Sequence, residues 1–336
     1  MLKKRCSTIT FKNPPSILSS FSVVGDKEGK GPLAQYFDLI TDDALFGEKS
    51  WEKAESKFLK TAIGGVMKKS NFQPEDVDFI FAGDLLNQCS SSHFAGRDFS
   101  VPFFGIFGAC STMAEGLCLG AMTVDGGFAE NVICATSSHF CAAEKQFRFP
   151  LEYGGQRPPT AQWTVTGGAA AIVTKSDKMP FITHITPGKI VDMGITDANN
   201  MGAAMAPAAA DTIALHFKDL NLSPSDYDLI VTGDLGVVGS AALKELLYEK
   251  GYDISENHAD CGCMIFDFKN QDVHSGGSGC CCGGATLCSK LLYQVKEGIY
   301  SKILFIATGA LMNTSTCLQG ESIPCIAHAV AISREK

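Results

Sequence analysis

Two stretches of the chain nearly repeat each other: PEDVDFIFAGDL at 74–85 and PSDYDLIVTGDL at 224–235. Seven of their twelve positions are identical, and Asn71 matches Asn221 just ahead of them. In each copy, a segment with apolar residues at helical spacing comes before the repeat. The apolar runs VDFIFA and YDLIVT are typical of buried parallel strands, and each is closed by Gly-Asp. Each copy therefore predicts a helix followed by a buried strand.

A second pair of segments follows at a matching distance. FGACSTMAEGLCLGAM at 107–122 leads to the strand-like NVICATSSH, and GSGCCCGGATLCSKLL at 277–292 leads to the strand-like SKILFIATG. Each half thus has the order helix, strand, turn, helix, strand. This order predicts a duplicated α/β chain with mixed, mainly parallel sheets. We place the two halves at 1–178 and 179–336.

The composition is that of a folded protein with no affinity for nucleic acid. Of the 336 residues, 45% are hydrophobic and 19% are charged, and the formal net charge of -8 disfavours contacts with phosphates. No apolar run approaches the ~20 residues of a membrane span. The N-terminal MLKKRCSTITF lacks the apolar stretch of a secretory signal. The sequence therefore predicts a soluble cytoplasmic protein.

The 14 cysteines are best interpreted as reduced thiols, because the chain is long and carries no export signal. The clusters CGC at 261–263 and CCC at 280–282 lack the paired spacing of zinc sites, so we interpret them as small buried residues. No acidic stretch has the spacing of an EF-hand calcium loop. No metal site is predicted.

Cys110 stands where the central helix of the first half should begin. A helix N-terminus has unpaired N–H groups and partial positive charge, which should lower the pKa of the thiol and provide donors for an oxyanion. The same geometry binds a carboxylate without any reaction. The helix end thus fits a nucleophile and an anion site equally well. Asp84 and Asp234, which close the repeated strands, are interpreted as structural residues, for example in Asx turns.

A duplicated α/β chain with a cysteine at the start of a central helix resembles the thiolase and ketoacyl-synthase superfamily. VHSGGSG at 273–279 is similar to the glycine-rich histidine loop of thiolases and puts His274 on that histidine. The resemblance implies a thiolase-like fold with layered αβαβα architecture. In the first half, five residues follow in thiolase-like order and spacing: Gly83, Gln88, Arg97, Pro102 and Cys110.

The chain also departs from that superfamily. Condensing enzymes carry a His or Asn after the second-half strand, where this chain has Gly233 and Asp234. A carboxylate there would repel a thioester enolate. The C-terminal region lacks the second reactive-cysteine motif of thiolases. These departures predict a catalytically degenerate protein; if it is active, Cys110 and His274 would be the catalytic residues.

Three runs are similar to the stage V sporulation protein AD family of spore-forming bacteria: FGACSTMAEGL (107–117), ATSSHFCAAEKQFRFPLEYGGQRPPTAQWTVTGGAA (135–170) and VHSGGSGCCCGGA (273–285). The resemblance implies a protein without a cofactor that binds dipicolinic acid (pyridine-2,6-dicarboxylate) and helps to move it, with calcium, into the developing spore. It implies membrane subunits of the same transport system as partners, and peripheral association with the spore inner membrane through them. By analogy with the superfamily, we expect a homodimer.

The candidate ligand-binding residues belong to the same runs. His274 can donate to a ligand carboxylate or hold its glycine-rich loop. His139 and the serines before it can donate to a ligand or cap a turn. Arg97, Arg148 and Arg157 are the candidate cations, with a structural role favoured for Arg97. The full predicted set is Cys110, Ser111, Ser137, Ser138, His139, Arg157, His274, Gly277 and Ser278.

Three functions remain open at this point. The leading one is dipicolinate binding by a degenerate thiolase-like protein. The second is an active acyltransferase or β-ketoacyl synthase-like condensing enzyme that uses Cys110. The third is a scaffold for membrane subunits with a vestigial pocket. Phe140, Phe147 and Trp163 could stack on a pyridine ring or belong to the core.

Overall fold

The computed structural model describes residues 7–148 and 150–336. The strands before residue 178 are β1 (Ile9–Thr10), β2 (Ser16–Val24), β3 (Leu39–Ile40), β4 (Phe79–Gly83), β5 (Phe103–Gly105), β6 (Asn131–Ser138), β7 (Trp163–Thr164) and β8 (Gly167–Thr174). The α-helices there are α1 (Asp26–Gly29), α2 (Trp51–Ser70), α3 (Ser90–Gly96), α4 (Thr112–Asp125) and α5 (Phe140–Glu144). Short 3-10 turns are η1 (Ala34–Tyr36), η2 (Pro74–Asp76), η3 (Asn87–Cys89), η4 (Ala109–Ser111) and η5 (Leu151–Tyr153).

The rest of the chain repeats this order. Its strands are β9 (Phe181–Pro187), β10 (Leu229–Thr232), β11 (His258–Asp260), β12 (Gly277–Ser278), β13 (Lys302–Ala310) and β14 (Cys325–Ser333). Its α-helices are α6 (Met201–Leu220), α7 (Gly236–Glu249), α8 (Cys261–Met264), α9 (Cys280–Thr286), α10 (Leu292–Lys296) and α11 (Thr314–Leu318). A 3-10 turn, η6 (Pro224–Asp226), precedes β10, and a π-helical segment, η7 (Leu287–Leu291), joins α9 to α10.

The residues that repeat in sequence hold the same structural places. Asn71 and Asn221 end α2 and α6 in the left-handed conformation, with φ of 57° and 54°. Asp76 and Asp226 each close a capping box, because their Oδ2 atoms accept a backbone N–H three residues earlier at 2.7 Å. The matches therefore fix where each helix ends and each strand begins.

The second aspartate of each repeat ties neighbouring strands together. Oδ2 of Asp78 accepts the N–H groups of Glu130 and Asn131, at 2.7 and 3.0 Å, at the start of β6. Oδ2 of Asp228 likewise accepts the N–H groups of Ser301 and Lys302, at 2.6 and 2.9 Å, at the start of β13. In both halves, the hydrogen bonds of this aspartate thus set the register between two paired parallel strands.

The main strands form one continuous sheet in the order β11-β10-β13-β14-β9-β2-β8-β6-β4-β5. Read outward from its centre, the order is β2-β8-β6-β4-β5 on one side and β9-β14-β13-β10-β11 on the other. Strands β4, β5 and β6 pair in parallel, as do β10, β11 and β13, whereas β8 and β14 pair antiparallel with their neighbours. The predicted mixed α/β class is confirmed. The boundary at 178/179 stays a prediction; it lies between β8 and β9.

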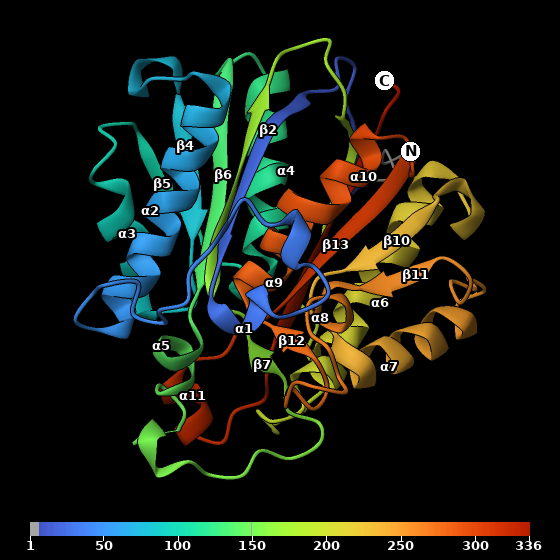
Figure 1. The fold of residues 1–336 in the computed structure, drawn as a ribbon. Coiled ribbons are helices and arrows are strands. Elements are labelled where there is room, and N and C mark those ends of the chain that lie inside the picture. The colour runs from blue at the N-terminus through green and yellow to red at the C-terminus, as the bar shows by residue number, and fades with distance from the viewer. Residues whose placement is uncertain (1–6, 149) are drawn as a thin grey trace.

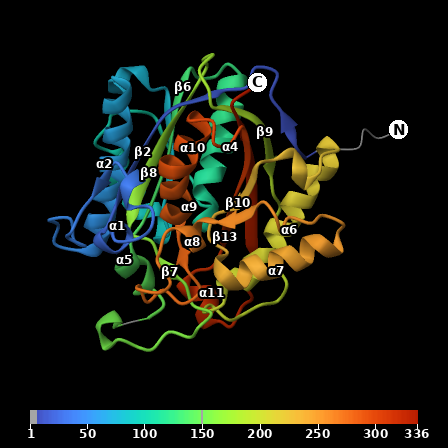
Figure 2. The same cartoon turned by 45° about the vertical axis from the view of Figure 1, so that its right-hand side comes forward.

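The helices lie in three layers around the sheet (Figures 1 and 2). Helix α2 packs on one outer face, over β2, β6 and β8, and α6 packs on the other outer face, over β13 and β14. Helices α4 and α9 lie between the two halves of the sheet; α4 contacts β6 and β8 of one half and β13 and β14 of the other. Three buried apolar clusters fill the spaces, represented by Phe58, Leu117 and Phe217. This gives the expected αβαβα arrangement.

Candidate functional site

Cys110 lies in the tight turn that opens α4. The turn is η4, which continues directly into α4. Ala109 has a left-handed backbone with φ of 48°. The hydroxyls of Ser111 and Thr112 fold back and donate to the carbonyls of Gly108 and Ala109, at 2.6 and 2.7 Å. Cys110 is therefore at a helix start, as its sequence context predicts, and Ser111 belongs to the turn itself.

The start of α9 meets this turn from the second half of the chain. The Cys280 thiol donates to the carbonyl of Ala109 at 3.0 Å. A Cβ at Gly309, in β13, would come within 2.1 Å of the Gly108 carbonyl oxygen. The thiols of CCC (280–282) are free and wholly buried, which supports the interpretation that these cysteines are small packing residues. Small residues thus let two helix starts approach each other.

A cavity of about 240 Å³ opens beside Cys110. Pockets for drug-sized ligands run from about 300 Å³ upward, so this one fits a smaller molecule. Its polar wall comprises Cys110, Glu144, Gln146, Arg148, Gln162, Thr164, Asn199 and Ser278. Its apolar wall includes Leu85, Phe107, Phe147, Met201 and Met312. Of the predicted site residues, Cys110 and Ser278 line this cavity.

The aspartates that close the repeated strands play different parts. Asp84 forms the predicted Asx turn, in which its Oδ1 accepts the N–H of Leu86 at 2.8 Å. Asp234 forms no such turn. In the second half, Asp260 accepts the N–H groups of the two residues after Asp234, each at 2.9 Å. The carboxylate of Asp234 is therefore available to other partners.

That carboxylate is buried next to Cys110. Its Oδ1 accepts the hydroxyl of Thr308 at 2.8 Å, and its Oδ2 accepts the N–H of Gly279 at 3.0 Å and the hydroxyl of Ser278 at 3.2 Å. Burial raises the pKa of Asp234, while the Cys110 thiol and these donors oppose the shift. Asp234 thus joins β10, β13 and the start of α9 behind the cavity.

The thiol of Cys110 is not activated. Only 7% of the residue is exposed. Burial raises the pKa of Cys110 well above its ordinary value, and the Asp234 carboxylate raises it further. The prediction that the helix end lowers this pKa is wrong, because desolvation and an adjacent negative charge outweigh the partial charge of the helix. At neutral pH the residue is a thiol, which is a poor nucleophile.

Much of the polar wall was not in the predicted site. Oε2 of Glu144 lies 3.3 Å from Nε of Arg148, and Oε1 of Glu144 accepts the hydroxyl of Thr164 at 3.2 Å. Burial raises the pKa of Glu144, and Arg148 opposes the shift. The sequence offers Arg148 as a candidate cation, whereas Glu144 and Gln162 are not among the predicted residues. The run 135–170 contains Glu144, Arg148, Gln162 and Thr164. Its sequence alone does not show which of its side chains face the cavity.

The two serines at the end of β6 are buried in structural hydrogen bonds. Ser138 donates to the carbonyl of Val165 at 2.7 Å and accepts the N–H of Cys281 at 3.1 Å. Ser137 lies 3.4 Å from Oε1 of Glu55. Neither serine lines the cavity beside Cys110. They hold β6 against α9 and α2.

His139 caps a helix. Its Nδ1 accepts the N–H groups of Cys141 and Ala142, at 3.2 and 3.4 Å, at the start of α5, and its Nε2 donates to the carbonyl of Ala44 at 2.8 Å. Burial lowers the pKa of His139, so the ring is neutral at physiological pH. It lies outside the residues that line the cavity.

Arg157 and His274 lie together, away from the wall of that cavity. Nη2 of Arg157 donates to the carbonyl of Asp272 at 3.1 Å, and Nε2 of His274 lies 3.2 Å from the Asp272 carboxylate. The Arg157 guanidinium covers the ring of Trp163 at 4.7 Å. Gly277 pairs with Trp163 between β12 and β7. His274 is therefore not among the residues that line the cavity beside Cys110.

A second hollow, of about 480 Å³, adjoins the first. Arg148 and Asn199 line both spaces. Arg157, Phe140 and Trp163 line only the second, and the last two stack on each other with ring centroids 3.7 Å apart. Arg148 thus belongs to both spaces, and Arg157 belongs to the second alone.

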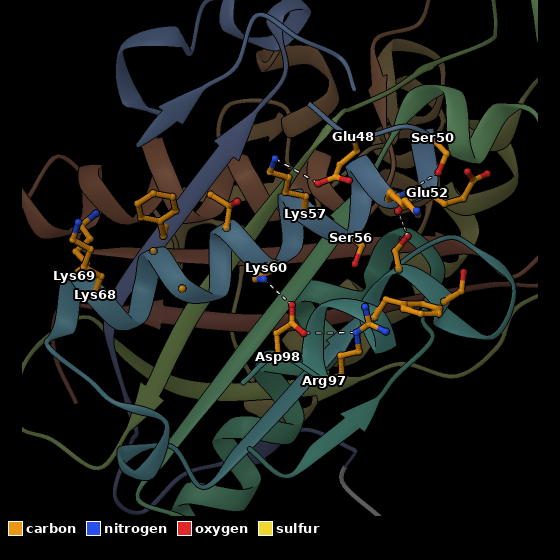
Figure 3. A pocket seen from close by; sticks show the side chains of 18 residues that line it. Glu48, Ser50, Glu52, Ser56, Lys57, Lys60, Lys68, Lys69, Arg97 and Asp98 are labelled. Carbon is orange, nitrogen blue, oxygen red and sulfur yellow. Dashed lines mark hydrogen bonds and ion pairs between the residues drawn. The ribbon is translucent and has the colours of Figure 1, made fainter. Parts of the chain in front are cut away.

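Another hollow is a groove along the outer side of α2, whose lining residues do not include Cys110 (Figure 3). Its charges are mostly joined in pairs: Lys57 with Glu48 at 3.5 Å, and Lys60 with Asp98 at 2.6 Å. Arg97 also reaches Asp98, at 3.6 Å; the structural role favoured for Arg97 stays a prediction. Exposed pairs of this kind stabilise a fold only slightly.

Among residues 7–148 and 150–336, no group of three or more His, Cys, Asp and Glu side chains could hold a metal ion. No helix in this part of the chain is long and apolar enough to cross a membrane.

Among the solved structures with the same fold are a synthase and a thiolase. The 3-oxoacyl-[acyl-carrier-protein] synthase III from Aquifex aeolicus VF5 aligns over 95% of this chain and 99% of its own, with a TM-score of 0.57 and 14% identity. Human mitochondrial 3-ketoacyl-CoA thiolase aligns over 96% and 98%, with a TM-score of 0.57 and 13% identity. The thiolase-like fold is therefore confirmed, and at these identities the likeness shows the fold alone.

The sequence matches are more specific. The stage V sporulation protein AD of Bacillus subtilis (strain 168) is 45% identical over 327 residues, which cover 97% of this chain and 96% of the relative. The family described as Stage V sporulation protein AD matches residues 5–333. The match spans both halves, including the turn at Cys110 and the wall of its cavity. The chain belongs to the stage V sporulation protein AD family.

Proposed function

We propose that the protein acts in sporulation by binding dipicolinic acid in the cavity beside Cys110, without acyl chemistry. The observation that carries the proposal is a small cavity with a helix start and Arg148 in its wall, next to a cysteine that is not activated. A carboxylate is stabilised by both a helix N-terminus and an arginine fork. An acyl-transfer site would need a reactive thiolate.

The walls suit a flat aromatic acid. Phe107, Phe147 and Met312 supply apolar surface for a pyridine ring. Ser278 and the turn at Cys110 offer polar contacts, and Arg148 offers a cation in the same wall. The volume of about 240 Å³ is enough for one such ring.

Condensation is disfavoured by the residue beside the sulfur. The Asp234 carboxylate raises the pKa of Cys110 and would repel the enolate that a condensing enzyme must stabilise. His274, the other predicted catalytic residue, contacts Asp272 instead of the cavity.

The direct test is a calorimetric titration of the purified protein with dipicolinate. We expect saturable binding at one site per chain. Arg148→Gln should weaken it about tenfold or more, since a charge-assisted hydrogen bond contributes about 1.5–3 kcal/mol. Arg97→Gln, which removes an arginine from the α2 groove, is the matched control and should leave binding unchanged. Equal effects of the two substitutions would place the ligand elsewhere.

An acyl-enzyme is the second candidate, because Cys110 keeps its place at a helix start in a fold shared with condensing enzymes. The test is incubation with acyl-CoA and acyl-carrier protein, followed by mass spectrometry of the peptide that contains Cys110. We expect no adduct at any chain length. A stoichiometric acyl group on Cys110, absent from Cys110→Ser, would favour the enzyme.

The partners follow from the same proposal. We propose that the protein associates peripherally with the spore inner membrane through membrane subunits of one transport system, that calcium accompanies the ligand, and that the chain forms a homodimer.

Strand β5 is an edge of the sheet, and Phe104 on it is 50% exposed, which is a surface that a second copy could cover. Light scattering of the wild type and of Phe104→Asp tests the dimer: the wild type should be dimeric and the variant monomeric. Co-purification from sporulating cells tests the membrane partners.

A further inference from the structure

The groove along α2 is basic, although the chain as a whole is acidic. The formal net charge of the protein is -8. Six basic and three acidic side chains line the groove, which has a volume of about 1380 Å³. The groove therefore concentrates positive charge on an acidic molecule. Its basic residues are Lys53, Lys57, Lys60, Lys68 and Lys69 on α2 and Arg97 just after α3 (Figure 3).

Lys53 and Lys68 are exposed, and neither forms an ion pair with any residue that the structure describes. They stand 15 residues apart on one helix, which corresponds to about 22 Å. An anion that meets both lysines must be long, so a small ligand does not fit this arrangement. The other charges of the groove have partners: Lys57 pairs with Glu48, Lys60 and Arg97 with Asp98, Lys69 with Asp38, and Glu52 with Lys145.

Gly64 lies in the middle of α2, on the face that carries the lysines and four residues before Lys68. Glycine inside a helix is destabilising relative to alanine. A Cβ at Gly64 would meet only the Phe99 ring, at 3.9 Å, so packing within the chain does not require glycine there. Gly65 differs, because a Cβ there would come within 2.6 Å of the Phe21 ring. What the missing side chain of Gly64 allows is a close approach to α2 from the groove.

Apolar surface accompanies the lysines. Phe94 on α3 lines the groove and is 56% exposed, and Phe21 and Gly64 line it as well. A helix with one apolar side can lay that side into such a groove and keep its charged residues at the rim, whereas a flat lipid surface cannot enter it. Two helices also pack more closely where a small residue lies at their contact. The shape and the charges together therefore fit an acidic amphipathic helix.

We propose that the α2 groove docks an amphipathic helix of a partner protein, whose carboxylates meet Lys53 and Lys68 and whose apolar side faces Gly64 and Phe94. The partner helix then needs acidic residues about four turns apart, because the two lysines are about 22 Å apart. That this partner is a membrane subunit rests on the proposed function; the groove itself does not depend on the dipicolinate site. Since the lysines are exposed, the association weakens as salt is added.

The test uses a labelled 18-residue peptide with glutamates near both ends and leucines along one side of the helix, titrated with the full-length protein and followed by fluorescence anisotropy. We expect saturable binding that weakens as NaCl is raised. A peptide of the same composition in scrambled order, which has no apolar side, should bind more weakly. The double variant Lys53→Glu/Lys68→Glu should lower the affinity about tenfold or more, because like charges then meet. Lys218→Glu/Lys250→Glu makes the same change of charge at exposed positions of the second half and should leave the affinity unchanged.

Gly64→Leu distinguishes docking from folding. Leucine favours the helix, and no group of the chain lies within 3.9 Å of the position where its side chain begins. We therefore expect an equal or higher urea midpoint together with about tenfold or more weaker peptide binding. Equal affinity of the wild type and Gly64→Leu for the peptide overturns the inference, as does equal affinity for the two peptides.

Two other occupants give different results. If vesicles of phosphatidylglycerol and phosphatidylcholine sediment the wild type and Gly64→Leu alike but not Lys53→Glu/Lys68→Glu, the groove binds a lipid surface and the inference is wrong. If light scattering shows a dimer that Gly64→Leu converts to a monomer, a second copy fills the groove and the inference is again wrong. Dipicolinate binding should be the same in the wild type and these variants. Its absence from the wild type would remove the proposed ligand and leave the groove intact, whereas absence of peptide binding would remove only the groove.

Discussion

Cys110 occupies a helix start, yet its surroundings keep it protonated. Burial and the Asp234 carboxylate together raise its pKa well above the ordinary value. We therefore expect slow alkylation by iodoacetamide at pH 7 in the folded protein, with a rate that still rises above pH 9, because the thiolate fraction grows only as pH approaches the raised pKa. Site-resolved mass spectrometry measures this, with the partly exposed Cys317 as the internal comparison. Faster modification of Cys110 than of Cys317 at pH 7 would contradict the assignment.

Asp234 is the second residue whose role is set by its neighbours. Asp234→Ala removes the acceptor shared by the N–H of Gly279 and the hydroxyls of Ser278 and Thr308. The expected cost is about 1–3 kcal/mol in the free energy of unfolding, as for other buried groups left without a partner. Urea denaturation measures it. Asp125→Ala, on an exposed position of α4, is the control and should change stability by less than about 0.5 kcal/mol.

At the scale of elements, the contact between β13 and the turn before α4 positions the cavity wall. A methyl group at Gly309 would come 2.1 Å from the carbonyl oxygen of Gly108, so Gly309→Ala must push the Cys110 turn away from the sheet. We expect a loss of about 1–3 kcal/mol of stability and weaker dipicolinate binding. Gly155→Ala, where an added Cβ meets nothing within 4 Å, should change neither. Unchanged dipicolinate binding by Gly309→Ala would show that the Cys110 turn does not contribute to the binding site.

Helix α1 carries a buried acid that links stability to pH. Oε1 of Glu28 accepts the N–H of Thr166 at 2.9 Å, and burial raises the pKa of Glu28 from 4.5 to about 7. The folded protein therefore binds this proton more tightly than the unfolded chain. The stability it contributes is present below pH 4.5 and is lost as pH rises through about 7. In total this amounts to about 3 kcal/mol.

Glu28→Gln cannot titrate and provides the comparison. The wild type should lose stability relative to the variant between pH 4.5 and 7 and differ by a constant amount outside that window. Urea midpoints measured in steps of pH give the difference. A gap between the two proteins that stays constant throughout would show that Glu28 is not the titrating group.

The helices and strands were largely predictable from the sequence, because the repeated residues carry the side chains that end helices and join strands. Asn71 and Asn221 end helices in both halves, and Asp78 and Asp228 hold paired strands. The site was less predictable. Gln162 is one polar residue in a long mixed run, and its importance arises from carbonyls that β10 and β12 bring to it. The pKa of Cys110 also depends on Asp234, which is remote in sequence.

At the scale of the whole molecule, the two halves share their central layer. The cluster around α4 and α9 joins Leu117 and Val173 from one half to Phe305 and Val330 from the other. Neither half can bury this layer alone. We expect the full chain to unfold in a single transition, with circular dichroism and tryptophan fluorescence coinciding in urea. The segments 1–178 and 179–336, expressed separately, should show no cooperative unfolding; a cooperative transition in either one would show that it is an independent domain.

We propose that one small acid binds between the two halves, where the starts of α4 and α9 meet. A crystal structure of the protein with dipicolinate tests this most directly. We expect density for one pyridine ring in the cavity lined by Cys110, Gln162 and Ser278, with a carboxylate toward Arg148. A ring bound in the groove along α2, with the Cys110 cavity empty, would contradict it.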